Sequence, residues 1–231
     1  MAHLFRTQGR KIIAIGRNFA EHAKELNNAV PTEPFFFLKP TTSYVDNGGK
    51  IEIPQGVVAH FEVELGAVIG KTGRDIPASD AMSYVAGYAL AIDMTARNMQ
   101  DKVKKAGLPW SAAKGFDSFT PISSFLPPSE IKDPHNVRLW LKTNGKTRQD
   151  GNTKDMIFQL PRLIEHVSSI MTVEEGDLIL TGTPSGVGPT EPGDELTAGL
   201  ETVEEGGKQG RVLAELKFAV EQRSGGYHFK P

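Results

Sequence analysis

The sequence predicts an α+β protein in which strands outnumber helices. Residues 61–69 place apolar side chains at every second position, as a β-strand does, and residues 84–92 are an apolar run of strand length. Residues 212–220 alternate in the same way. By contrast, residues 94–106 and 155–171 repeat their apolar positions at helical spacing. The chain is therefore expected to combine several strands with fewer, amphipathic helices.

Shorter stretches complete this outline. Further strands are expected at residues 11–15, 35–39, 51–54, 137–142 and 178–180. The first two are apolar enough to be buried, whereas Pro54 closes an edge strand. Asn144 and Gly145 predict a type I′ hairpin turn. A short helix is expected at residues 20–26, Pro161 should start or kink helix 155–171, and residues 225–229 should be disordered or peripheral.

Length, charge and cysteine content limit the class of protein. The 231 residues suit one domain and contain no obvious linker, so residues 1–231 are expected to form a single domain. The net charge of −2 gives no nucleic-acid-binding footprint. The absence of cysteine excludes disulfides, thiolate metal sites and a cysteine nucleophile. No apolar run reaches the roughly 20 residues of a membrane span, so we expect an intracellular protein without nucleic-acid or membrane partners.

Three acidic residues suggest a metal site. Glu62 and Glu64 share the less apolar face of the strand at 61–69, where their like charges repel unless a cation lies between them. Asp93 follows directly after the apolar run at 84–92. Each has an ordinary alternative, because the two glutamates suit a solvated face and Asp93 suits a helix N-cap. Together they favour a divalent cation such as Mg²⁺, which prefers carboxylate oxygens.

Other polar residues suggest a reaction site around this cluster. His22 and Glu25 are three residues apart, so a helix would place the carboxylate beside the imidazole, as in a general base or a surface ion pair. Arg97 and Gln100 continue a helical stripe from Asp93. Lys39 ends an apolar run, and is either a surface residue or a positive group aimed into a site. The loop at 181–189 exposes N–H groups suited to holding a carboxylate, or is a plain wide turn.

Six motifs in this order resemble the fumarylacetoacetate hydrolase family. They occupy residues 16–22 (GRNFAEH), 37–40 (FLKP), 60–65 (HFEVEL), 93–97 with Gln100 (DMTAR), 110–114 (WSAAK) and 181–188 (TGTPSGVG). The resemblance runs from about residue 11 to about residue 220. It is strongest to the small single-domain branch, the acylpyruvases, also described as oxaloacetate decarboxylases or oxaloacetate tautomerases. Phe61 and Phe19 depart from it, because relatives often carry His or Tyr at the first position and Tyr at the second.

The resemblance implies a fold, a cofactor and a set of site residues. The fold would be a mixed, strongly curved β-roll with peripheral helices, usually in a homodimer. Mg²⁺, or Mn²⁺ in its place, would be held by Glu62, Glu64 and Asp93. His22 and Glu25 would form a catalytic dyad with Lys114 as a further catalytic residue. Four residues would bind the substrate: Arg17, Arg97, Gln100 and Thr183.

The implied activity is metal-dependent cleavage of the C–C bond of acylpyruvates, with a small 2-oxo acid as substrate. His22 would deprotonate a water molecule, and the cleavage would leave the enolate of pyruvate. Oxaloacetate decarboxylation uses the same enolate, and oxaloacetate keto–enol tautomerisation is the alternative main activity. A non-catalytic metal-binding β-module is the alternative outside enzymes. A serine hydrolase is disfavoured, because Ser185 does not lie in a G-x-S-x-G elbow.

The expected compartment depends on the source. The first eleven residues include Arg6, Arg10 and Lys11 and no acidic residue, as the end of a mitochondrial presequence would. We expect the mitochondrial matrix for a eukaryotic source and the cytoplasm otherwise.

Overall fold

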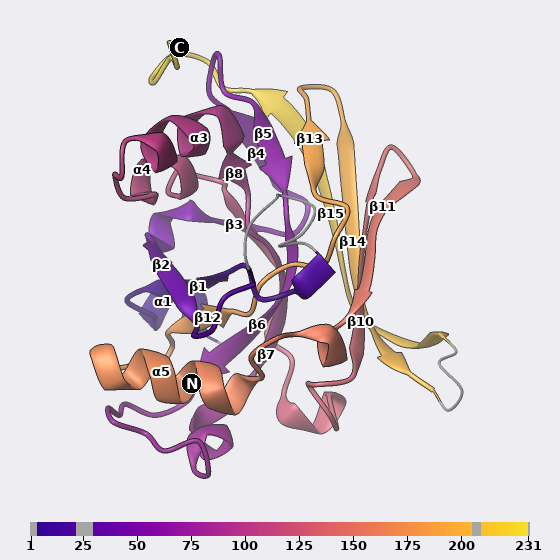
Figure 1. The fold of residues 1–231 in the computed structure, drawn as a ribbon. Coiled ribbons are helices and arrows are strands. Elements are labelled where there is room, and N and C mark those ends of the chain that lie inside the picture. Colours follow the sequence, from indigo (N-terminus) through magenta and orange to yellow (C-terminus); the bar gives the residue numbers. More distant parts are fainter. Residues whose placement is uncertain (1–3, 22–29, 205–208, 231) are drawn as a thin grey trace.

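The computed structural model describes residues 4–21, 30–204 and 209–230, and its largest sheet has seven strands (Figure 1). In order across the sheet they are β2 (Phe35–Lys39), β1 (Ile12–Gly16), β12 (Leu178–Leu180), β6 (Val63–Ile69), β7 (Val85–Ile92), β9 (Thr120–Ile122) and β3 (Tyr44–Asp46). β1 and β12 pair in parallel, as do β3 and β9, and the other neighbours are antiparallel. The sheet is therefore mixed.

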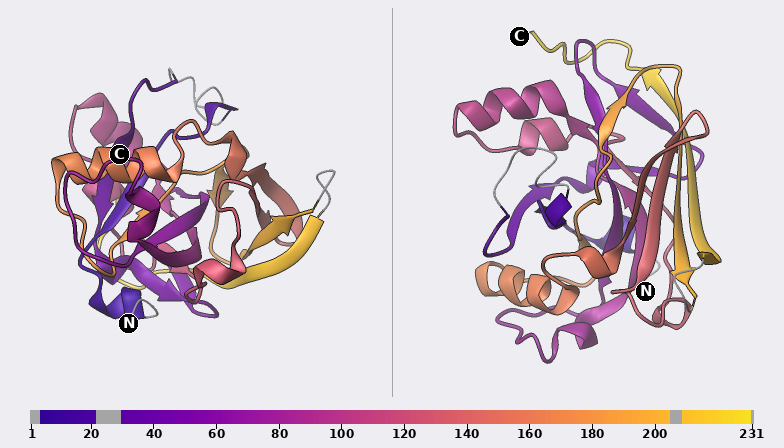
Figure 2. Two further views of the ribbon diagram at one scale, coloured as in Figure 1. Left: turned by 90° about the horizontal axis from the view of Figure 1, so that it is seen from below. Right: turned by 45° about the vertical axis from the view of Figure 1, so that its right-hand side comes forward.

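A second sheet of five strands forms a curved wall on the right of Figure 1. Its order is β11 (Lys146–Asn152), β10 (Val137–Thr143), β14 (Glu195–Val203), β15 (Gln209–Gln222) and β4 (Lys50–Ile53). Figure 2 shows the same curvature from two further directions. Asn144 and Gly145 both have positive φ, 51° and 76°, which confirms the hairpin turn between β10 and β11. β4 lies at the edge, as expected.

A third, small sheet joins β13 (Gly188–Thr190), β5 (Ala59–Phe61) and β8 (Thr95–Ala96). β5 and β6 are therefore two strands in different sheets, where the sequence pattern predicted one strand over residues 61–69. The chain passes from one sheet to the other at Glu62. Alternation of side chains continues through this point, which is why the break leaves no mark in the sequence.

The helices lie outside the sheets. Those that lie wholly within the described residues are α1 (Phe5–Gln8), α3 (Arg97–Lys105), α4 (Ser111–Lys114) and α5 (Leu160–Ile170), with single 3₁₀ turns at η2 (Thr41–Ser43), η3 (Ala81–Tyr84), η4 (Pro128–Glu130) and η5 (Thr153–Asp155). In Figure 1, α3, α4 and α5 lie on the side away from β10 and β11. None of the helices in the described part of the chain has the length and apolarity to cross a membrane.

Two predicted helices begin later than the sequence pattern indicates. The helix expected from residue 94 begins at Arg97, because residues 95–96 pair with β5 instead. The helix expected from residue 155 begins at Leu160, with Pro161 in its first turn, so the proline starts the helix and does not kink it. The helix expected at residues 20–26 falls largely outside the described residues.

The main hydrophobic core lies between the seven-stranded and five-stranded sheets. Leu65 and Leu90 contribute to it from β6 and β7, and Leu139, Leu200 and Phe218 contribute from β10, β14 and β15. A second cluster, which includes Leu163 and Val167, packs α5 on the other face of the large sheet. The mixed, curved roll with peripheral helices is confirmed.

One expectation about burial is wrong, and one is met only in part. β2 is an edge strand, and Phe35 and Leu38 on it are exposed, where a buried strand was expected. The C-terminal residues are peripheral but ordered against the fold: Phe229 is buried, and its backbone N–H donates to the carbonyl oxygen of Gln55 at 2.9 Å. The side chain of Phe229 packs into the main core, whereas the two glycines before it have no side chain that could do so.

Candidate active site

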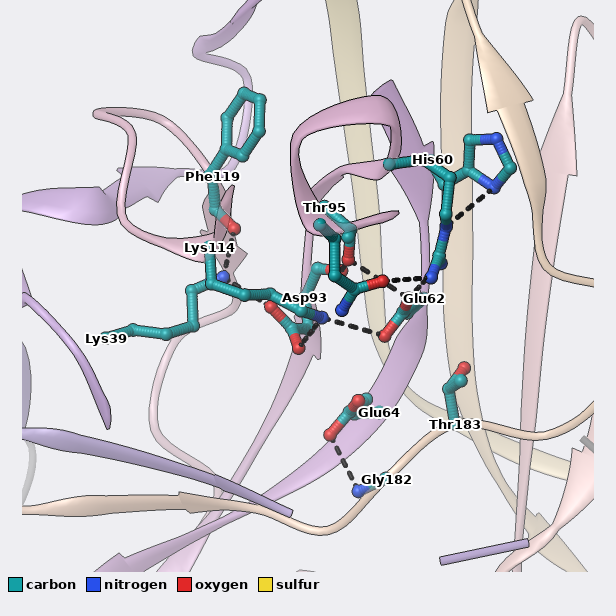
Figure 3. Close-up of polar contacts among 12 residues, drawn as sticks. Lys39, His60, Glu62, Glu64, Asp93, Thr95, Lys114, Phe119, Gly182 and Thr183 are labelled. Atoms are coloured by element: carbon teal, nitrogen blue, oxygen red, sulfur yellow. Dashed lines mark hydrogen bonds and ion pairs between the residues drawn. The ribbon is translucent and has the colours of Figure 1, made fainter. Parts of the chain in front are cut away.

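Three carboxylates converge at the place where β5, β6 and β7 meet (Figure 3). Oxygen atoms of Glu62, Glu64 and Asp93 all lie within 4.8 Å of one another. Glu64 is opposite Ala91 in the β6–β7 pair, and the backbone N–H of Asp93 donates to the carbonyl of Glu62 at 2.7 Å. Strand pairing thus brings residues some 30 positions apart into one cluster.

Burial decides between the alternatives for these residues. Glu62, Glu64 and Asp93 are 7%, 1% and 1% exposed, so the solvated face is wrong. The N-cap alternative for Asp93 is also wrong, because α3 begins at Arg97 with Ala96 as its cap residue. Buried carboxylates are costly unless they are paired or hold a metal. Three clustered carboxylates provide hard oxygen donors, a set that fits a divalent cation such as Mg²⁺ or Mn²⁺.

Two buried lysines contact the cluster. The ammonium group of Lys114, at the end of α4, donates to Glu62 Oε2 at 3.0 Å and to Asp93 Oδ2 at 2.5 Å. The ammonium group of Lys39, at the end of β2, donates to Asp93 Oδ1 at 2.5 Å and to the carbonyl of Phe119 at 2.6 Å. Lys39 therefore points into the site and is not a surface residue. Each oxygen of Asp93 accepts from one ammonium group.

Burial and neighbouring charges shift the pKa of these groups in different directions. Burial, together with the like charges of Asp93 and Glu62, raises the pKa of Glu64 well above its usual value. Burial lowers the pKa of Lys39, although Asp93 opposes this change. Burial also acts against the charged form of Lys114, but Asp93 and Glu62 outweigh it and raise its pKa. Of the two lysines, Lys114 is therefore the one whose charged form the cluster favours.

Arg97 connects Glu62 to the wall of the site. Its guanidinium donates to Glu62 Oε1 at 2.6 Å, to Gln100 Oε1 at 2.5 Å and to Nδ1 of His60 at 3.4 Å. The hydroxyl of Thr95 also donates to Glu62 Oε1, at 3.0 Å. Burial, with the positive charge of Arg97, lowers the pKa of His60 to about 4, so this imidazole is neutral at pH 7. Arg97 and Thr95 therefore hold Oε1 of Glu62 in place, while Oε2 accepts from Lys114.

The loop after β12 holds a carboxylate, as its sequence suggested. The backbone N–H of Gly182 donates to Glu64 Oε2 at 2.7 Å (Figure 3). This carboxylate is that of Glu64, a residue of the protein and not of a ligand, and the sequence did not indicate this partner. The plain-turn alternative is therefore wrong.

The cluster lines a cavity of about 340 Å³. The same cavity is lined by most of the residues that the sequence assigned to the site, namely Arg17, Glu62, Glu64, Asp93, Arg97, Gln100, Lys114 and Thr183. Phe37 and Trp110 form an apolar part of its wall, with ring centroids 5.5 Å apart. His22 and Glu25, the expected dyad, lie outside the described residues.

Two residues around the cluster, His60 and Gln149, received no role from the sequence, and the role of Lys39 was left open. Lys39 carried a signal, because a lysine at the end of an apolar run needs a buried partner, just as Asp93 does. His60 directly precedes the alternating stretch. Gln149 lies in a polar strand and carried no signal, although its side chain reaches Val63 between the two glutamates.

The comparisons with known proteins agree with this geometry. The family model described as "Fumarylacetoacetate (FAA) hydrolase C-terminal" matches residues 11–215. The chain belongs to this family. The resemblance seen in the six motifs is confirmed, and the motifs that matched are those that line the cavity.

Relatives with assigned activities cover nearly the whole chain. "Oxaloacetate tautomerase FAHD1, mitochondrial" of Arabidopsis thaliana is 57% identical over 217 residues, 94% of this chain and 93% of that protein. "Oxaloacetate decarboxylase, mitochondrial" of Dictyostelium discoideum is 59% identical over 194 residues, 83% of this chain and 89% of that protein. This chain is an enzyme of the family.

A solved structure of a relative contains a metal. Fumarylpyruvate hydrolase from Pseudomonas aeruginosa, in complex with Mn²⁺ and pyruvate, has a TM-score of 0.82 and 34% identity, covering 93% of this chain and 90% of its own. The yeast fumarylacetoacetate hydrolase family protein ynq8 has a TM-score of 0.87 and 37% identity, covering 99% and 100%.

Proposed function

We propose that this enzyme uses Mg²⁺ to convert small 2-oxo acids through an enolate, and that oxaloacetate is its principal substrate. One observation carries the proposal: three buried carboxylates and the ammonium of Lys114 share one cavity. Relatives that are named for oxaloacetate and are 52–59% identical over more than four fifths of this chain support the choice of substrate.

The charges around the cluster support a dianionic substrate. Among the described residues, Lys39, Lys114 and Arg97 contact Glu62 and Asp93, so the cluster with Glu64 contains three formal negative and three formal positive charges. A divalent cation adds two positive charges to this balanced set. A dicarboxylate such as oxaloacetate restores the balance, whereas a monoanionic acylpyruvate leaves one charge over.

Glu62, Glu64 and Asp93 would hold the cation. A sparse set of carboxylates suits Mg²⁺, which keeps several water molecules, and Mn²⁺ has similar preferences. When bound, the cation supplies a Lewis acid that polarises the 2-oxo group and stabilises negative charge on it.

The residues of the cavity wall divide the remaining work. We assign Arg17, Arg97, Gln100 and Thr183, all of which line the cavity, to binding and orienting the substrate. Lys114 stabilises the negative charge that develops on the oxygen as the enolate forms, and its raised pKa keeps it protonated for this purpose. The Phe37 ring, 4.9 Å from the Lys114 ammonium, keeps water from one side of it.

We assign proton transfer to His22, oriented by Glu25. In tautomerisation the dyad takes a proton from C3 of oxaloacetate while the C2 oxygen gains one, and it reverses both steps in the other direction. In decarboxylation the C3–C4 bond breaks, CO₂ leaves, the electron pair enters the enolate, and C3 is then protonated.

Hydrolysis of acylpyruvates is a second candidate activity. It is favoured by the likeness to the fumarylpyruvate hydrolase structure that contains pyruvate. Here His22 would deprotonate a water molecule that attacks the distal carbonyl, and the C–C bond would break to leave a carboxylic acid and the enolate of pyruvate.

Activity assays test the proposal. The ultraviolet absorbance of the oxaloacetate enol follows tautomerisation, and coupled pyruvate detection follows decarboxylation and acylpyruvate hydrolysis. We expect activity with Mg²⁺, higher on oxaloacetate than on acetylpyruvate, and its loss on addition of EDTA or in Glu64→Gln. Activity that persists in EDTA would contradict a metal enzyme, and inactivity on every 2-oxo acid would indicate a metal-binding module.

Assembly, domain organisation and compartment complete the proposal. We infer that the whole chain acts as a single catalytic domain and forms a homodimer, as the family resemblance implies. Light scattering after gel filtration should give twice the monomer mass.

We place a eukaryotic source protein in the mitochondrial matrix, as the names of its relatives support, and otherwise in the cytoplasm. The location of a fluorescent fusion protein in the source cell distinguishes the mitochondrial matrix from the cytoplasm.

A further inference from the structure

The backbone of Val63, between Glu62 and Glu64, loses its strand partner on one side. β12 pairs with β6 only opposite residues Gly66, Ala67 and Val68, and it ends at Leu180. In an antiparallel sheet, alternate residues direct their N–H and C=O groups to opposite neighbours. The carbonyl of Glu62 accepts from Asp93, on the β7 side, so the groups of Val63 point to the side where β12 has ended.

Two side chains replace the missing strand. The side-chain oxygen of Gln149, in β11, accepts from the Val63 N–H at 2.9 Å, and the hydroxyl of Thr183 donates to the Val63 carbonyl at 2.8 Å. The amide nitrogen of Gln149 donates to that hydroxyl oxygen and to the carbonyl of Pro184, both at 2.8 Å. Both side chains are buried, so water does not compete for these bonds.

The loop and β11 approach closely enough for this reach. Gly186 has a φ of +92°, and a Cβ atom there would lie 2.0 Å from the carbonyl oxygen of Arg148. A side chain at this position would therefore push the loop away from β11. Gln149 extends from the five-stranded sheet to the seven-stranded one at this contact, and Thr183 lies beside Glu64 and Gly182 in Figure 3.

From this geometry we propose that Gln149, together with the hydroxyl of Thr183, is a positioning residue for the divalent-cation site. The two side chains fix both peptide groups of Val63 and so set the spacing of the carboxylates on either side of it. The single hydroxyl proton of Thr183 is used by Val63, so Thr183 would contact substrate through its other atoms. This inference rests on the proposed metal site, but not on the identity of the substrate.

Direct measurement of Mn²⁺ binding tests the inference. Gln149→Met keeps the length of the side chain and removes its hydrogen bonds, and Thr183→Val keeps its shape without the hydroxyl. Since groups that orient metal ligands typically change affinity by about 10–100-fold, we expect each variant to weaken Mn²⁺ binding by that factor, measured by electron paramagnetic resonance. Thr183→Ser, which retains the hydroxyl, should stay within about threefold of the unmodified protein.

Gln159→Met is the matched control. Gln159 also donates to a backbone carbonyl, that of Thr153 at 3.2 Å, but it contacts none of the three carboxylates. This control should leave Mn²⁺ affinity unchanged. Circular dichroism establishes that each variant is folded before titration, and Thr183→Val carries the test alone if Gln149→Met does not fold.

The outcomes separate this inference from the proposed function. Unchanged Mn²⁺ affinity in Gln149→Met and Thr183→Val would overturn the inference, even if oxaloacetate turnover remained sensitive to EDTA. Unchanged affinity with a raised KM in Thr183→Val would assign the hydroxyl to the substrate instead. Weakened Mn²⁺ binding in a protein that turns over no 2-oxo acid would support the positioning role while the proposed function fails. No Mn²⁺ binding by the unmodified protein would overturn both.

Discussion

Lys114 should have opposite effects on catalysis and on metal binding. Its ammonium contacts Glu62 and Asp93, two of the three carboxylates that would hold the cation. In the proposed mechanism the same ammonium stabilises the developing enolate. A residue in this position should help catalysis and oppose metal binding at once, because it occupies oxygen lone pairs that the cation needs.

Lys114→Met separates these two effects. Removing a buried donor from a developing negative charge typically lowers kcat by about 100- to 1,000-fold, and we expect a loss of this size for oxaloacetate, measured under saturating Mg²⁺. Mn²⁺ affinity should be retained or increased. Lys11→Met, which removes an ion pair with Glu174 and Asp177 away from the cavity, is the control. A kcat within about threefold of the unmodified enzyme would remove Lys114 from the mechanism.

His60 should make stability depend on pH. Its pKa is lowered to about 4 in the folded protein, from about 6.5 in the unfolded chain. Between these values the unfolded chain binds the additional proton, so stability falls as the pH falls from 6.5 toward 4. His60→Gln should make the unfolding free energy depend less on pH in this range. The reduction is at most about a tenfold change in the folding equilibrium constant per pH unit, and urea titrations at several pH values measure it. Parallel pH profiles for the two proteins would contradict this assignment.

The residues of the site differ in how far the sequence revealed them. Glu62, Glu64 and Asp93 followed from strand alternation and from an acid at the end of an apolar run, both of which are local patterns. Lys39 and Gln149 reach the site across 54 and 86 positions of the chain. The apolar run before Lys39 indicated that it could enter a site, but no local pattern identifies a partner so distant in the chain.

At the scale of elements, local signals were reliable where tertiary contacts did not override them. The Asn144–Gly145 turn depends only on its own backbone preferences and was predicted correctly. The helix start at residue 94 was wrong because residues 95–96 pair with β5 in the small sheet, whose paired residues are 35 and 37 positions away. Pairing with β5 gives the backbone of these two residues strand hydrogen-bond partners in place of helical ones.

The C-terminal segment is a further case, and its contribution to stability is testable. Phe229 belongs to the main core, whereas Tyr227 is exposed. Truncating a central core phenylalanine costs about 3–5 kcal/mol, and for this peripheral one we expect Phe229→Ala to cost about 2 kcal/mol. Tyr227→Ala, the matched control, should cost less than about 1 kcal/mol. Equal unfolding free energies for Phe229→Ala and the unmodified protein would show that the segment does not dock.

At the scale of the whole molecule, the roll brings distant segments to one cavity. Lys39, Asp93 and Thr183 come from the beginning, middle and end of the chain, and β12 lies between β1 and β6 although it follows both in sequence. Composition and periodicity predicted the strands but contained no information on this order. The curved roll was predictable only through the family resemblance.

A cation that binds the folded protein alone should stabilise the whole molecule. At a concentration of one hundred times Kd, Mn²⁺ should raise the unfolding free energy by about 2.7 kcal/mol, which corresponds to roughly 5–10 °C in Tm for a chain of this length. Glu64→Gln should abolish this shift, measured by calorimetry. Stabilisation of equal size in Glu64→Gln would place the ion elsewhere.

The most direct test of the account is anomalous diffraction from crystals of this protein grown with Mn²⁺. We expect one strong peak inside the cavity, within about 2.0–2.3 Å of an oxygen atom from each of Glu62, Glu64 and Asp93. A well-ordered map without that peak, in which the three carboxylates bind only Lys39, Lys114 and Arg97, would contradict it.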